Sequence, residues 1–83
     1  MKLVFKCQKE LVMLDIDRKN KRLKVASSKT GYRPKITSWS MLFDKGLERQ
    51  QEKKTDKLND KDFKIAIIIN MAKLGYKLVR EKW

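Results

Sequence analysis

The 83 residues contain no histidine, one cysteine, one proline and three glycines. Without histidine, the chain lacks the commonest general base and the commonest zinc ligand. Because Cys7 is the single cysteine, no disulfide forms within one chain, which fits a reducing, cytoplasmic environment. Glycine-rich phosphate loops and the short motifs of hydrolases are also missing. We therefore expect a protein that is not an enzyme and that uses no metal and no cofactor.

Long hydrophobic runs are missing as well. The apolar run Ala66–Ile69 is far shorter than the ~20 residues that span a bilayer. Residues 1–7 are interrupted by Lys6 and contain no small-residue cleavage site, so they indicate a strand rather than a signal peptide. A hydrophobic fraction of 41% nevertheless suffices for a small core. We expect one domain over residues 1–83, with no membrane segment.

Positive charge is what the sequence has in abundance. Lysine and arginine number 22 against 10 acidic residues, which gives a net charge of +12. Residues 1–43 hold eleven basic and three acidic groups, residues 44–64 hold seven and six, and residues 65–83 hold four and one. Most of the excess therefore lies in the N-terminal half. Because such an excess repels itself in a compact fold, it favours a polyanionic partner.

Alternation of side chains predicts strands in the first third of the chain. Residues 2–8 alternate between two faces, and residues 11–17 resume the pattern with apolar side chains on both faces at the start, which is typical of a central strand. Residues 22–27 alternate again, and Asn20 in the intervening turn readily adopts the left-handed conformation of a short loop. We therefore predict a β-hairpin over residues 11–27.

Residues 35–43 fit two different structures. A helix capped at Thr37 or Ser38 would place Trp39 on an apolar stripe, whereas a strand would place it on one face of a sheet. Gly46, which follows shortly, would cost ~1 kcal/mol inside a helix. We therefore favour the strand, ended by a turn. Residues 47–58 are almost wholly polar and fit a solvated helix or an irregular segment.

The clearest helical signal lies near the C-terminus. Asn59 or Asp60 is a good N-cap, and an apolar stripe then recurs at helical spacing. The stripe consists of Phe63, Ile67, Met71 and Leu74. Further isoleucines widen it, so we expect most of the helix's circumference to be covered. Residues 76–83 predict a final strand. The expected fold is α+β: a small antiparallel sheet of about four to five strands packed against one apolar C-terminal helix, and residues 47–58 add a second, polar helix if they are helical.

The cations of the N-terminal half gather at the hairpin and just after it. A β-ribbon with a cationic tip can lie along DNA or RNA phosphates, and each neutralised phosphate releases counterions. Tyr32 offers an aromatic face to an unpaired base, whereas Trp39, beside Ile36 and Phe43, fits the core better. Lysines also solubilise turns and edge strands. The predicted nucleic-acid-binding residues are Arg18, Lys19, Lys21, Arg22, Lys24, Lys29, Tyr32, Arg33 and Lys35.

Other interpretations stay open. The cations also suit an acidic protein surface, as in a phage or mobile-element accessory or inhibitor protein that binds a host protein or nucleoprotein complex. Asp15 and Asp17 share a strand face in a spacing that suits Mg²⁺ in a nuclease, although nearby cations favour cross-strand pairs. An exposed strand at either sheet edge would let two copies form a homodimer. Residues 11–29 resemble the hairpin near the end of S1-type RNA-binding OB domains, but an S1 barrel needs more strands before it than residues 1–10 provide.

Overall fold

The structure, a computed structural model, describes residues 1–82. Strands dominate the first half and helices the second, and a last strand follows the helices. In chain order the elements are β1 (Lys2–Cys7), β2 (Glu10–Asp17), β3 (Arg22–Ser27), the 3-10 helix η1 (Ser28–Thr30), β4 (Lys35–Thr37), the 3-10 helix η2 (Trp39–Leu42), α1 (Glu48–Asp56), α2 (Asp60–Lys73) and β5 (Lys77–Lys82). The predicted α+β fold is confirmed. Trp83, the end of the predicted last strand, lies outside the described residues.

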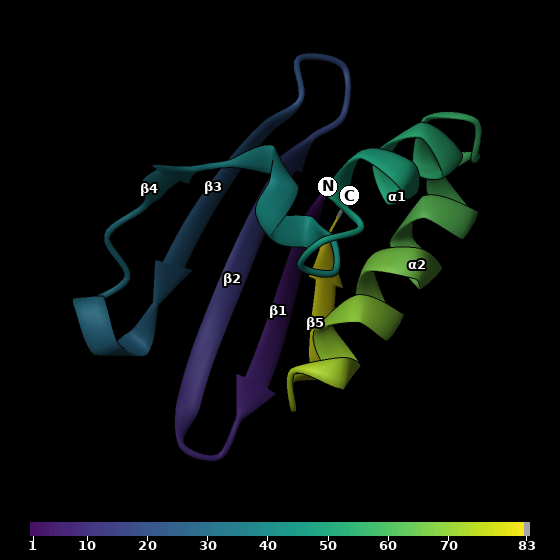
Figure 1. The fold of residues 1–83 in the computed structure, drawn as a ribbon. Helices are drawn as coiled ribbons and strands as arrows, with labels where there is room; N and C mark the ends of the chain where they lie inside the picture. The colour runs from purple at the N-terminus through teal and green to yellow at the C-terminus, as the bar shows by residue number, and fades with distance from the viewer. Residues whose placement is uncertain (83) are drawn as a thin grey trace.

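The strands form one antiparallel sheet in the order β4-β3-β2-β1-β5. β2 is the central strand, as the apolar residues on both of its faces predicted. β5 adds to β1 on the far side, with Lys2 opposite Lys82, so the two ends of the described chain lie side by side (Figure 1). The first and last strands of the sequence are therefore neighbours in the sheet.

Both helices lie on the same side of the sheet (Figure 1). Alternation along each strand sends one set of side chains toward them, and these side chains form the core. In β1 and β2, for example, Leu3 is opposite Leu14 and Phe5 is opposite Val12, and all four are buried. The core consists of Leu3, Phe5, Val12, Leu14, Ile16, Leu23, Leu42, Phe43, Phe63, Ile67 and Met71. No described helix or strand covers the other face, which we call the open face.

Residues 35–43 combine the two predicted alternatives. Only Lys35–Thr37 pair as a strand, and Trp39–Leu42 then form a single 3-10 turn. The consecutive residues Leu42 and Phe43 are both buried, whereas a strand in a sheet with one open face would send one of the two side chains to solvent. The segment leaves the edge of the sheet and crosses to the helical layer (Figure 1), and this crossing is what ends the strand.

The predicted α2 helix is confirmed, but its expected coverage is wrong. Asn59 is the N-cap and accepts a hydrogen bond from the backbone N–H of Asp62 at 2.8 Å. Phe63, Ile67 and Met71 are buried, whereas Ile65 and Ile69 are 44% and 53% exposed. The physical reason is that a single helical layer covers only the sheet-facing side of each helix. Leu74, the last predicted member of the buried stripe, lies just beyond the helix and is exposed.

Candidate functional site

The β2–β3 turn has a different conformation from the predicted one. Lys21, rather than Asn20, takes the positive φ of 50°. Asn20 is instead bound to Asp17: its backbone N–H donates to Oδ1 at 3.3 Å and its side-chain Nδ2 donates to Oδ2 at 2.9 Å. The side-chain bond from Asn20 is the main reason that the pKa of Asp17 falls below 3.8. Asn20 is thus held by the Asp17 carboxylate, and Lys21 is the residue of the turn with the left-handed backbone conformation.

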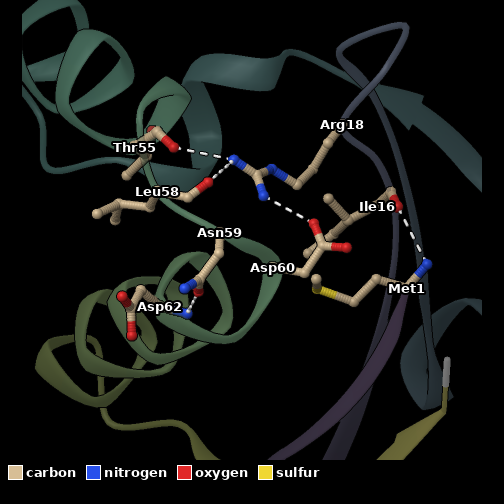
Figure 2. A network of polar contacts seen from close by, with 8 residues as sticks. All are labelled: Met1, Ile16, Arg18, Thr55, Leu58, Asn59, Asp60 and Asp62. Atoms are coloured by element: carbon tan, nitrogen blue, oxygen red, sulfur yellow. Dashed lines mark hydrogen bonds and ion pairs between the residues drawn. The ribbon is translucent and has the colours of Figure 1, made fainter.

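Arg18 at this turn fastens the hairpin to the helices (Figure 2). Its Nη1 donates to Asp60 Oδ1 at 2.7 Å, and its Nη2 donates to the carbonyl oxygens of Thr55 at 3.0 Å and Leu58 at 2.9 Å. The guanidinium carbon also lies 4.2 Å from the centre of the Phe63 ring. Those carbonyls belong to the last turn of α1 and the connection to α2, and the Thr55 carbonyl also accepts from the backbone N–H of Leu58 at 3.1 Å. Arg18 is thus a structural cation, and its side chain is only 22% exposed.

Two more of the predicted cations are held by acidic side chains. Lys21 Nζ lies 3.0 Å from Asp56 and 3.5 Å from Glu52, both on α1. The hydrogen bond to Asp56 is the main cause that raises the pKa of Lys21 above 10.5. Lys29 Nζ lies 3.3 Å from Glu10. Lys21 at the tip therefore faces acidic residues of α1, and Lys29, beyond β3, faces Glu10 at the start of β2.

Arg22 and Lys24 project from β3 on the opposite side, the open face. Lys24 is opposite Asp15 and Arg22 is opposite Asp17 in the β2–β3 register, so Asp15 and Asp17 share this face as predicted. Among residues 1–82, no group of three or more histidine, cysteine, aspartate or glutamate side chains is arranged to hold a metal ion.

Sequence reasoning missed the cations that β1 and β5 add to the open face. Lys6 is opposite Lys77, and Val4 is opposite Arg80. Lys2 lies on the same face, opposite Asp15 of β2. The available signal was that Lys2 and Lys6 are four residues apart in β1 and therefore share a face. Whether they form a cluster depends on the pairing of β1 with β5, and these two strands are separated by almost the whole chain. All of these basic residues are exposed.

The register arranges the open face in rows. A middle row of apolar or small side chains runs from Ala26 through Met13 to Val4 and ends at Arg80. One neighbouring row contains Lys24, Asp15 and Lys2, and the other contains Leu11, Lys6 and Lys77. Lys6, Lys77 and Arg80 therefore form a cluster, here called the β1–β5 cluster, with no acidic side chain in their own rows. The open face combines an apolar centre with cations on both sides.

The other predicted residues lie elsewhere. Lys29, Tyr32 and Arg33 follow β3 at the end of the sheet away from the hairpin tip, and Lys35 begins the edge strand β4. Tyr32 is 51% exposed. Lys19 is exposed at the tip. Trp39 packs on the helical side, with its ring 6.1 Å from that of Phe63 and nearly parallel to it, in line with the expectation that it belongs to the core. The structure does not bring the nine predicted residues together on one surface.

Comparisons add no relative from which a role could be inferred. No family model, curated protein or solved structure is significantly similar to this chain. Within residues 1–82, no helix has the length and apolar character that crossing a bilayer requires. What the chain does must therefore be argued from the surfaces described above.

Proposed function

We propose that this protein binds nucleic acid without catalysing a reaction, and that the open face makes the contact. One observation carries the proposal: Lys6 and Lys77 are directly opposite each other on an uncovered sheet face, and Arg80 lies in the next row. Like charges opposite one another in a sheet are destabilising. The Lys6–Lys77 pair has no acidic side chain in its row, so a bound anionic partner would relieve the repulsion between the two lysines.

The chemistry of the open face favours phosphate contacts over recognition of individual bases. Lysine and arginine neutralise phosphates and release condensed counterions, which gives affinity without sequence preference. The rows of the open face contain no aromatic side chain among the described residues, so stacking of unpaired bases has no platform there. Asp15 lies between Lys2 and Lys24 in its row and repels phosphate. We therefore expect the phosphate backbone to follow the β1–β5 cluster.

The test is a titration of fluorescent single- and double-stranded DNA and RNA at two salt concentrations. The native protein should bind at low salt, and its affinity should fall steeply as salt rises. The double variant Lys6→Gln/Lys77→Gln should bind several-fold more weakly and should reduce the salt slope by about 2, one for each lost phosphate contact. Lys77→Gln alone should leave the fold as stable as before or slightly more so, by up to about 0.5 kcal/mol, because it removes the like-charge pair.

The matched control is Lys45→Gln/Lys53→Gln, which removes the same charge from exposed positions on the helical side. It should keep nearly all of the affinity. Absence of binding at low salt would overturn the proposal. Equal losses in the two double variants would show that net charge, and not the open face, governs binding.

A second candidate function rests on the apolar middle row. Val4 and Met13 are only partly covered, and an apolar strip flanked by cations also suits an acidic protein surface, as expected for an accessory or inhibitor protein. In that case a stoichiometric protein complex should form. Variants of Met13 should then weaken it as much as variants of Lys6, whereas nucleic-acid binding should depend mainly on Lys6.

A further inference from the structure

The outer side of α2 carries an apolar stripe that nothing in the described chain covers. Ile65 and Ile69 are 44% and 53% exposed, and Ala72, three residues further along, is also exposed. At 100° per residue these three positions lie on one side of the helix, opposite the buried Phe63, Ile67 and Met71. Single exposed apolar residues are ordinary, but a row of them along one helix is typical of an interface.

The charged side chains beside this stripe are self-complementary: an acidic side chain of one copy meets a basic side chain of a second copy when the two stripes pack together. Asp62 and Lys73 are eleven residues apart, or about three helical turns, and so flank the stripe on the same side. When two copies of α2 pack antiparallel about a two-fold axis, Ile65 of one copy meets Ile69 of the other. Asp62 then approaches Lys73 of the second copy. Lys73 already lies 2.8 Å from Asp44 in its own chain and remains 55% exposed, so it can reach a second carboxylate. Antiparallel helix dipoles add to the attraction.

Charge also distinguishes this surface from the other surfaces through which two copies could meet. The helix α2 itself holds three basic residues, Lys61, Lys64 and Lys73, against two acidic ones, Asp60 and Asp62, whereas residues 1–43 carry a large basic excess. The exposed edge of β5 reads Lys-Leu-Val-Arg-Glu-Lys. Its Glu81 is already bound to Lys64 at 3.0 Å, so two β5 edges would meet mainly through like charges. The helical layer is therefore where two strongly cationic copies repel each other least.

We propose that two copies of this chain associate through the outer side of α2, packed antiparallel, with Ile65 and Ile69 at the centre. The helices lie on one side of each sheet, so this contact places the two open faces on opposite outer surfaces of the dimer. If the open face binds nucleic acid as proposed above, the dimer holds two nucleic-acid segments at once. Only that last consequence rests on the proposed function.

Sedimentation of the full chain, without nucleic acid, tests the association. Dimer should form as concentration rises from the micromolar to the millimolar range, and added salt should favour it by screening the repulsion between copies. Ile69→Glu should weaken self-association by about tenfold or more, because it places a charge at the centre of the interface. Ile36→Glu is the matched control: Ile36 is 80% exposed on β4, away from α2, and its variant should associate like the native chain. Thermal unfolding should give similar midpoints for both.

Disulfide trapping tests the orientation of the two helices. In a Cys7→Ala background, a mixture of Ile65→Cys and Ile69→Cys chains should form a mixed disulfide in preference to either homodimer, because antiparallel packing brings 65 near 69. A monomer at every concentration and salt would overturn the proposal. So would association that Ile69→Glu leaves unchanged or that Ile36→Glu weakens equally. Preferential 65–65 and 69–69 disulfides would overturn the antiparallel arrangement. None of these results depends on nucleic acid, so failure here leaves the proposed function untouched, and the reverse also holds.

Discussion

The hairpin tip and the open face carry cations that are neighbours in the sequence and differ completely in their surroundings. Arg18 and Lys21 turn toward the helices, where Asp60 and Asp56 hold them. Arg22 and Lys24 begin the next strand and turn to the open face. The first pair is bound by the helical layer, whereas the second lies on the open face opposite Asp17 and Asp15. A run of basic residues in a sequence is therefore not yet a basic surface.

The difference follows from the geometry of the hairpin. Strand alternation sends successive side chains to opposite faces. In the turn between β2 and β3 this alternation stops, and the side chains of Arg18 and Lys21 both point toward the helices. The helical layer at the tip supplies acidic side chains and backbone carbonyls that contact Arg18 and Lys21 directly. On the open face, Asp15 and Asp17 lie opposite Lys24 and Arg22 in the register, and the β1–β5 cluster has no acidic side chain in its rows. Cations at the tip thus lower the free energy of the fold, and cations on the open face leave it nearly unchanged. Substitutions that separate stability from binding test this division.

The largest expected effect is that of Arg18→Ala. The substitution removes the hydrogen bonds to Thr55, Leu58 and Asp60 and the contact with Phe63. It leaves the Leu58 carbonyl without this partner, whereas the Thr55 carbonyl keeps its bond from the Leu58 N–H, so we expect a loss of about 2–3 kcal/mol in the free energy of unfolding. Urea unfolding measures this loss. Lys19→Ala, at the next and exposed position, should change the free energy of unfolding by less than about 0.5 kcal/mol. Similar values for the two variants would contradict the structural role of Arg18.

Most of the fold could be predicted from local patterns. Period-2 alternation located β1, β2 and β3, and helical spacing with an N-cap located α2, because these signals arise from neighbouring residues. The segment 35–43 was ambiguous because its path depends on crossing from the sheet edge to the helices, which no local pattern encodes. The exposure of Ile65 and Ile69 was missed for a related reason: apolar residues around a helix show what it can bury but not whether the chain supplies a cover.

The candidate site was less predictable than the fold. Its cations on β3 lie within the predicted run, but Lys6, Lys77 and Arg80 come together only because β5 pairs with β1. That pairing joins the two ends of the chain, and the sequence gives no turn signal for it. The structural role of Arg18 likewise depends on the position of the α1–α2 connection. Long-range contacts decided which of the twenty-two basic residues are available.

A smaller effect should separate the adjacent residues Lys21 and Arg22. Lys21→Gln removes the pairs with Glu52 and Asp56 and should lower the free energy of unfolding by a small amount, because the pairs are solvent-exposed. Its nucleic-acid affinity should stay close to the native value. Arg22→Gln should do the opposite, with nearly native stability and weaker binding at low salt. Urea unfolding and the fluorescence titration measure the two properties on the same samples, and a joint loss of both in either variant would abolish the division between tip and open face.

The smallest expected effect is a pH dependence of that same difference. Because Asp56 raises the pKa of Lys21 above 10.5 in the folded chain, the ion pairs contribute fully at neutral pH and lose their contribution as pH rises through the folded pKa. The native chain and Lys21→Gln should therefore differ by a constant amount between about pH 7 and 9 and converge at more alkaline pH. Other lysines titrate equally in both chains, so the difference isolates Lys21.

The control is the difference in the free energy of unfolding between the native chain and Arg22→Gln. It should stay constant over the same pH range, because arginine keeps its proton there. Urea unfolding across the series measures both gaps, and a native–Lys21→Gln gap that persists above the folded pKa would mean that Lys21 acts through its packing and not through its charge.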